Sequence, residues 1–353
     1  MPQAHINRIT TAVPPHDVHD AFLGFGRLML QGDPRKRALF DRMADRCAIA
    51  HRYSFIRPGG VAPALDAAGF YRMDDFPTTA ARMTLYEQHA PALAMEAVEK
   101  LLAGEDRTRI SHIIVTSCTG FSAPGIDLEI IQRCGLKPDV ERTMVGFMGC
   151  YAAVNGLKLA RHIVRSDPGA RVLAVNLELC SLHLHQTDDL EEILSFLLFA
   201  DGCAAALVSA DPIGVVMEGF KSRLMPETRE LIRWNIRDQG FDMVLSGGVP
   251  GAIRGALTEA RHDLFSGIND IELWAVHPGG KTVLDAVAQA FALEPEKLSA
   301  SRGVLNDYGN MSSGTVMFVL DRLMRSATPG QRGAAMSFGP GLVAETMTFR
   351  MAA

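Results

Sequence analysis

Residues 271–292 read IELWAVHPGGKTVLDAVAQAFA, and this stretch decides the fold class. The apolar run Ile271–Val276 predicts a buried strand, and Pro278-Gly279-Gly280 predicts a tight turn. The spacing of apolar residues over Lys281–Ala292 then predicts a helix. His277 stands where the strand ends, a position from which a loop displays a side chain toward a cleft. The stretch is therefore one α/β unit that carries a reactive residue on its turn.

The same unit of strand, glycine-containing turn, polar residue and helix occurs again near Cys150 and near Asn310. Because buried strands alternate with helices, we expect an α/β protein whose sheets are covered by helices. The repetition indicates a coarse duplication with a seam at residues 211–214, so that 1–212 and 213–353 form two halves. Further strands are predicted at Ser111–Ser117, Arg171–Leu177, Ala204–Ser209 and Gly333–Ser337, and further helices at Tyr151–Arg165 and Ser313–Arg325.

The composition limits the classes of function. The chain has 353 residues, of which 48% are hydrophobic, and this is enough to bury a large core. A net charge of −5 gives no overall attraction to nucleic acid or anionic lipid. No apolar run reaches the ~18 residues that a membrane span needs, and the N-terminus lacks a signal-peptide pattern. Six cysteines without a CxxC pair indicate reduced thiols, and we expect a cytoplasmic protein.

Cys150 follows two glycines in the sequence VGFMGCYAA, residues 145–153, and opens a predicted helix. A thiol at a helix N-terminus is expected to have a lowered pKa, and its thiolate would be a nucleophile. The alternative is a buried cysteine that packs as a small hydrophobic residue. The local sequence does not decide between the two.

His277 and Asn310 have similar alternatives. A lone histidine is most often structural, and Asn310, in LNDYGNMSSG at 305–314, could cap the following helix or donate to a substrate oxygen. Together with Cys150 they fit one chemistry. The thiolate captures an acyl group, and the imidazole and amide donors stabilise the enolate that forms when a malonyl thioester loses carbon dioxide. This reaction needs neither a metal nor an organic cofactor.

Around these residues the sequence resembles the chalcone and stilbene synthases, the type III polyketide synthases, from about Ile6 to Phe349. The segments that carry the resemblance are TAVPP (11–15), HRYSF (51–55), TSCTGFSAPGIDLEI (116–130), LLFADGCAAAL (197–207) and SFGPGLVAE (337–345). The resemblance implies a thiolase-like fold, with duplicated βαβ halves in layers αβαβα, and a homodimer. It also implies acyl-CoA and malonyl-CoA as substrates, Cys150 as the nucleophile, and His277 with Asn310 as the decarboxylation and oxyanion site.

The resemblance assigns further positions to substrate binding. Phe199 matches a gatekeeper phenylalanine, Met243 a second gatekeeper, and His183 lies near a cavity position. Trp234 replaces a small glycine, and Cys118 replaces a frequent threonine. The remaining assignments are Ser312, the loop Gly339-Pro340-Gly341, and the CoA contacts Arg42 and Arg46. A third basic contact falls near Leu39, and it is either lost or replaced by Arg37. These changes favour an aliphatic starter that yields a pyrone or resorcinol.

Three other interpretations stay open. Cys180, His183 and His185 could be read as metal ligands, but no fourth ligand is evident nearby, so no metal site is expected. A ketosynthase III-type enzyme would act once on a malonyl-acyl-carrier protein. Its histidine loop usually reads HQAN, however, where this chain has HPGG (277–280). A catalytically silent binding subunit of the same fold is the third.

Overall fold

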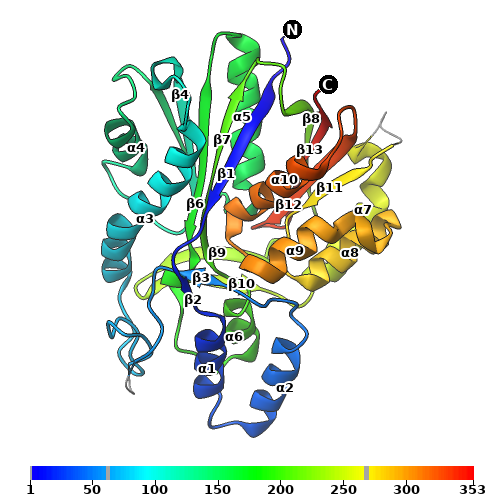
Figure 1. The fold of residues 1–353 in the computed structure, drawn as a ribbon. Coiled ribbons are helices and arrows are strands. Elements are labelled where there is room, and N and C mark those ends of the chain that lie inside the picture. The colour runs from blue at the N-terminus through cyan, green and yellow to red at the C-terminus, as the bar shows by residue number, and fades with distance from the viewer. Residues whose placement is uncertain (1, 61–63, 266–269) are drawn as a thin grey trace.

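A computed structural model describes residues 2–60, 64–265 and 270–353. Its centre is a nine-stranded sheet with the order β11-β12-β13-β8-β1-β7-β6-β4-β5 (Figure 1). The strands are β1 His5–Ala12, β4 His112–Ser117, β5 Glu141–Gly146, β6 Val172–Leu179, β7 Asp201–Ser209, β8 Val215–Leu224, β11 Leu273–Val276, β12 Arg332–Gly339 and β13 Val343–Met351. The predicted strands are confirmed, although the one expected from Ala204 already begins at Asp201.

The strand order repeats on either side of the sheet's centre. From the centre outward the first half runs β1, β7, β6, β4, and the second runs β8, β13, β12, β11. In both, the first two contacts are antiparallel and the third is parallel. The halves meet where β1 pairs with β8. The duplication expected from the recurring units is thus present in the topology.

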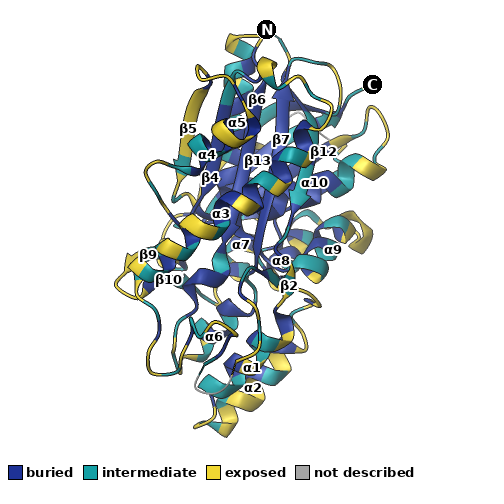
Figure 2. Cartoon of the chain, turned by 60° about the vertical axis from the view of Figure 1, so that its left-hand side comes forward, coloured by how far each residue is buried: buried dark blue, intermediate teal, exposed yellow. Residues whose placement is uncertain are grey.

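Helices cover both faces of the two half-sheets, and the successive layers are αβαβα. Helices α5 (Ala152–Ser166) and α10 (Thr315–Ser326) pack in one core with strand residues from both halves. Helices α3 (Thr79–Leu102) and α4 (Ile126–Cys134) cover the first half on its other face. The second half is covered by α7 (Val249–Leu264), α8 (Lys281–Phe291) and α9 (Ser299–Tyr308). The central strands β6 and β7 are buried along their whole length, which explains their unbroken apolar runs, whereas the edge strand β5 is mostly exposed (Figure 2).

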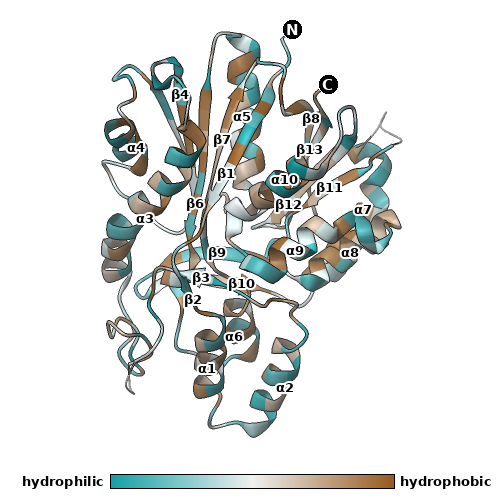
Figure 3. Ribbon diagram, viewed as in Figure 1, coloured by the Kyte–Doolittle hydropathy of each residue, from teal (hydrophilic) through white to brown (hydrophobic). Residues whose placement is uncertain are grey.

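A smaller assembly lies at one end of the molecule. Helices α1 (His19–Met29), α2 (Pro34–Ala44) and α6 (Leu190–Phe196) pack together below the main sheet in Figure 1. Two short sheets lie beside them: β2 (His16–Asp17) with β3 (Tyr53–Ser54), and β9 (Ile232–Arg237) with β10 (Gly240–Leu245). Helix α2 is largely hydrophilic (Figure 3), although it also exposes Leu39 and Met43. Among the described residues, no helix is both long and apolar enough to cross a bilayer.

Short 3₁₀ turns complete the chain at η1 Arg107–Arg109, η2 Gly149–Tyr151, η3 Cys180–His183, η4 Pro295–Leu298 and η5 Ser312–Gly314. Three of them, η2, η3 and η5, follow the C-terminal end of a main-sheet strand or precede a core helix. These are the positions where side chains are held rigidly yet face a cleft. The candidate site is built on them.

Candidate active site

Cys150 lies on η2, between β5 and α5, and is 9% exposed. The turn is possible because Gly149 adopts φ +72°, a conformation that other residues rarely take. Gly339, at the end of β12, packs directly on the same turn, where a Cβ would lie 2.6 Å from Tyr151 Cδ1. A Cβ on Gly149 would in turn meet Pro340 Cδ at 2.2 Å. The glycines therefore let the loop at residues 339–341 close against the cysteine.

The expectation of a lowered thiol pKa at this helix start is wrong. Burial raises the pKa of Cys150 to about 12, and the hydrogen bond with Ser312 only partly opposes this. The helix dipole acts within a site that excludes water, and removing the thiolate's hydration costs more than the dipole returns. The Cys150 thiol is therefore neutral at neutral pH.

A chain of contacts joins the three residues that sequence analysis brought together. The Sγ of Cys150 lies 3.6 Å from the Oγ of Ser312. The backbone N–H of Ser312 donates to Oδ1 of Asn310 over 2.8 Å, and Asn310 Nδ2 points to the carbonyl of Gly279 over 3.4 Å. Gly279 in turn follows His277, whose carbonyl accepts from the Gly279 N–H. The oxygen of Asn310 thus accepts from the first residue of η5, and its amide nitrogen, which points to Gly279, carries a second N–H.

His277 is 1% exposed, and neither ring nitrogen has a hydrogen-bond partner among the described residues. Buried polar groups are nearly always paired, so an unpaired ring at the end of a strand indicates a group whose nitrogens are available to hydrogen-bond a ligand. Burial lowers its pKa to about 3. The imidazole is therefore neutral at physiological pH and carries one N–H donor and one acceptor.

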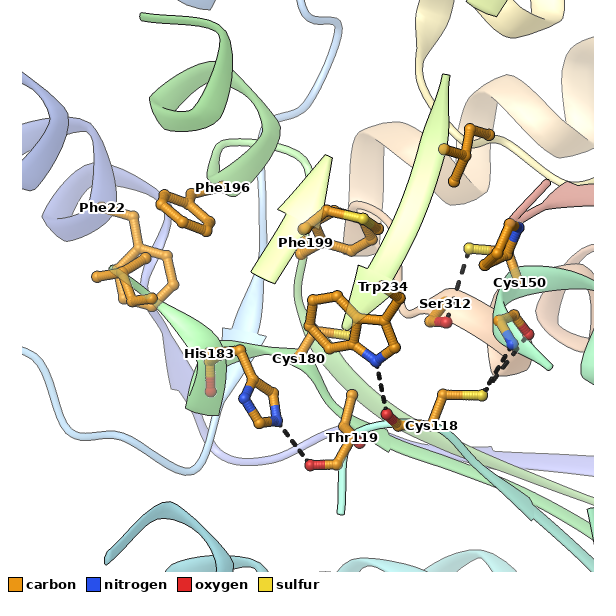
Figure 4. A pocket seen from close by; sticks show the side chains of 16 residues that line it. Phe22, Cys118, Thr119, Cys150, Cys180, His183, Phe196, Phe199, Trp234 and Ser312 are labelled. Atoms are coloured by element: carbon orange, nitrogen blue, oxygen red, sulfur yellow. Dashed lines mark hydrogen bonds between the residues drawn. The ribbon is translucent and has the colours of Figure 1, made fainter. Parts of the chain in front are cut away.

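A pocket of about 610 Å³, which includes its opening to solvent, holds the sulfur of Cys150 at one end (Figure 4). Phe22 and Phe196 line the opposite end, where α1 and α6 meet, and Leu184 belongs to the same apolar cluster. The sequence-predicted residues that line it are Cys118, Cys150, His183, Phe199, Trp234, Met243, Ser312 and Pro340. His277, Asn310, Gly339 and Gly341 stand outside the lining, and so do Arg42 and Arg46, both exposed.

Trp234 is held rigidly in the wall. Its indole N–H donates to the carbonyl of Cys118 over 2.8 Å (Figure 4). Its ring meets His183 and Phe241 edge-on, with centroids 5.2 and 5.6 Å away. Met243 lies opposite Trp234 in the β9–β10 register. The hairpin therefore forms one wall of the pocket.

His183 is a structural member of this wall. Its Nε2 lies 2.7 Å from the Thr119 carbonyl, and its Nδ1 accepts from the Phe241 N–H over 3.1 Å. With both ring nitrogens used, it has none left for a metal. No group of three or more His, Cys, Asp or Glu side chains could hold a metal ion in the part of the chain that the structure describes.

Glu178 is a residue that sequence analysis missed. It lies within β6, is fully buried, and accepts hydrogen bonds from the Cys118 N–H, Thr119 Oγ1 and Ser313 Oγ. Burial raises its pKa to about 7. The sequence did contain a signal for this residue, namely a single acid inside the apolar run VLAVNLEL (172–179). Buried carboxylates without a basic partner occur most often at functional sites.

Comparison with known proteins agrees with this geometry. The families "Chalcone and stilbene synthases, N-terminal domain" and "C-terminal domain" match residues 2–212 and 217–353. The chain is 33% identical to the alpha-pyrone synthesis polyketide synthase-like Pks18 of Mycobacterium tuberculosis, over 90% of this chain and 83% of that one. It is 37% identical to bisdemethoxycurcumin synthase of Oryza sativa, over 77% and 74%.

Solved structures give the same result. The polyketide synthase PKS-I of the brown alga Ectocarpus siliculosus superposes with a TM-score of 0.88 and 30% identity, covering 99% of both chains. The type III polyketide synthase domain of Steely1 from Dictyostelium, at 23% identity, shares the fold with a TM-score of 0.89 over 99% of this chain and 100% of that one. The chain therefore belongs to the chalcone and stilbene synthase family, and it is a type III polyketide synthase with the thiolase-like fold.

Proposed function

We propose that Cys150 carries the growing chain as a thioester. Its sulfur attacks the carbonyl of an acyl-CoA starter, the bond from that carbonyl to the CoA sulfur breaks, and the thiol proton ends on the released CoA. Because burial keeps the free thiol protonated, the proton must leave as the new bond forms. The placement of Cys150 at the end of an apolar pocket supports this role.

Extension uses His277 and Asn310 as donors. Malonyl-CoA loses carbon dioxide, and the electron pair of the broken carbon–carbon bond becomes the enolate of acetyl-CoA. The enolate then attacks the thioester carbonyl on Cys150 and releases the sulfur. A neutral imidazole N–H and the amide Nδ2–H suit the enolate oxygen, since preformed donors need no rearrangement when the charge develops. The observation that carries the proposal is the unpaired, buried, neutral ring of His277.

The test is turnover with purified enzyme, a panel of acyl-CoA starters and malonyl-CoA, without carrier protein or added cofactor. Intact-protein mass spectrometry should detect acylated Cys150, and Cys150→Ala should remove that adduct. His277→Ala and Asn310→Ala should retain loading and lose decarboxylation. Loading that persists in Cys150→Ala would refute the assignment of the nucleophile. Acylation is the better readout than alkylation, because a protonated thiol alkylates slowly.

We further propose an aliphatic starter that gives a pyrone or resorcinol. The far end of the pocket is lined by Phe22 and Phe196, with Leu184 in the same apolar cluster, and these side chains offer no polar partner for a hydroxylated ring. The alpha-pyrone activity in the name of one relative favours the same class of product. If the enzyme consumed malonyl-CoA alone and ignored aliphatic starters of every length, this part would fail.

Arg42 and Arg46 are proposed as contacts for the CoA phosphates. Both are exposed, Arg42 in the last turn of α2 and Arg46 two residues after its end, and no hydrogen bond or ion pair joins either guanidinium to another described residue. Free cationic side chains of this kind suit a polyanion. Replacing both with glutamine should raise the KM for CoA thioesters and leave kcat nearly unchanged.

A homodimer is proposed through the edge of the first half-sheet. Strand β5 pairs with β4 on one side only, and most of its residues are exposed. Met144, Phe121 and Met148 expose 46, 43 and 37% of their surface there, an apolar edge that a second copy would cover. Sedimentation of wild type and Met144→Glu tests this, and a monomeric wild type would refute it.

The repeated strand order also supports a division into halves 1–212 and 213–353. All six cysteines are free, which agrees with a reducing compartment, and we propose the cytoplasm.

Family membership and the HPGG loop count against the ketosynthase III-type alternative, and carrier-free turnover would exclude it. Loading of Cys150 would exclude a silent binding subunit.

A further inference from the structure

Two arginines, Arg52 and Arg82, are the largest fully buried side chains, both 0% exposed. Among the described residues neither guanidinium has a carboxylate within ion-pair distance. Burying a cation without a counter-ion is costly, and an apolar residue of similar volume would usually serve stability as well or better. We therefore examined which groups the guanidinium of Arg52 holds in place.

The guanidinium of Arg52 joins two segments of the site. Its Nη1 donates to the carbonyls of Phe196 and Phe199, over 2.8 and 3.3 Å. On the other edge, Nε donates to His19 Nδ1 over 3.1 Å and Nη2 to the His19 carbonyl over 3.3 Å. The group also lies over the ring of Phe22, 5.1 Å from its centre. One planar group thus ties the start of α1 to the segment that ends at Phe199.

The stem of the same side chain supports the loop that presents Asn310. A Cβ on Gly309 would lie 2.8 Å from Arg52 Cγ and 2.9 Å from the carbonyl of Leu198. Asn310 itself pairs with the Phe199 segment, since its N–H donates to Leu198 O over 2.8 Å and its carbonyl accepts from Ala200 N–H over 2.9 Å. Arg52 therefore contacts both partners of this pairing.

We propose that Arg52 is a positioning residue for condensation, which fixes the ring of Phe199 and the amide of Asn310 relative to each other. This rests on the proposed roles of those two residues. Neither contact involves η2, the turn that carries Cys150. We call the guanidinium of Arg52, with its hydrogen bonds to His19 on one edge and to Phe196 and Phe199 on the other, the fork. Loss of the fork should misplace the enolate relative to the thioester, and should leave the capture of the starter largely intact.

The first test replaces Arg52 with lysine, which keeps the charge and the stem but cannot donate to both segments. We expect kcat for condensation and starter-free decarboxylation of malonyl-CoA to fall about 10- to 100-fold, the usual effect of a displaced catalytic group. The KM for malonyl-CoA and single-turnover acylation of Cys150 should change less than about threefold. Arg82→Lys is the matched control. Arg82 is equally buried and also donates to carbonyls, those of Leu182 and Leu184. It should lose comparable thermal stability without the fall in kcat.

A second pair of variants tests the fork from its other end. His19→Leu removes the acceptor for Arg52 Nε, while His19→Asn places an amide oxygen close to the same position. We expect His19→Leu to lower kcat and His19→Asn to restore it. This pair remains informative if Arg52→Lys does not fold.

Wild-type kcat in folded Arg52→Lys or in folded His19→Leu would overturn the proposal. Losses of kcat that follow thermal stability equally in the Arg52 and Arg82 variants would also overturn it. Asn310→Ala and Phe199→Ala are measured alongside. Full activity in those two would refute the proposed function itself, whereas low activity there with an active Arg52→Lys refutes the positioning role alone.

Discussion

Replacing Trp234 with alanine should lengthen the polyketide that the enzyme releases. Trp234 and its cross-strand neighbour Met243 form one wall of the pocket that contains Cys150. Because the ring faces the pocket, its removal adds space where the chain grows and does not leave a sealed void. The expected products carry at least one further malonyl-derived unit.

The stability cost follows from the contacts of the ring. Truncation of a buried tryptophan to alanine costs about 3–5 kcal/mol. Trp234 is only half-buried and borders the pocket, so we expect about 2 kcal/mol. About 1 kcal/mol of this belongs to the hydrogen bond from its Nε1 to Cys118 O. Trp234→Phe should lose only that contribution and keep the product length.

The assay is mass spectrometry of products from one starter at several malonyl-CoA concentrations, with urea unfolding of each variant. Trp234→Phe is the matched control, since it keeps the wall and loses the hydrogen bond. Folded Trp234→Ala that makes only wild-type products would refute the reasoning. So would a Trp234→Phe variant that lengthens the products equally.

Three further predictions concern the site. The alkylation rate of Cys150 by iodoacetamide should rise about tenfold per pH unit from pH 7 to 9, because its pKa is raised to about 12, and a plateau near pH 7 would contradict this. Gly339→Ala should lower kcat about 10- to 100-fold, since its Cβ would lie 3.3 Å from Cys150 N, while Gly251→Ala on α7, with open space around it, should have no effect in the same assay. The folded-state pKa of Glu178, about 7, exceeds the ordinary 4.5, so the folded protein binds the extra proton and its unfolding free energy falls as pH rises between these values. Glu178→Gln should remove up to about 3 kcal/mol of that decline in urea unfolding, and parallel wild-type and variant curves would contradict it.

The sequence predicted the central strands well because a strand with both faces buried must be apolar at nearly every position, as in β6. It did not predict the β9–β10 hairpin, whose residues are mixed in polarity because one side faces the pocket and the other solvent. The glycines beside Cys150 and His277 were a sufficient signal for the two turns that carry these residues, because glycine permits close approach of the backbone.

Other properties of the site depend on contacts between distant segments. The predicted protonation state of Cys150 was wrong because an argument from the local helix dipole contains no information about burial. Arg52 was visible in HRYSF without a role, because its partner Phe196 lies 144 residues away. The pocket's far wall, with Phe22, depends likewise on how α1 packs against α6.

The β9–β10 hairpin forms a sheet of its own, separate from the strands that support Cys150 and His277. Its inward residues can therefore vary in size while the scaffold beneath the reacting atoms stays unaltered. An architecture of this kind lets a lineage diversify its metabolites through a few hairpin positions, and mutagenesis confined to that hairpin is the economical route to new ring sizes.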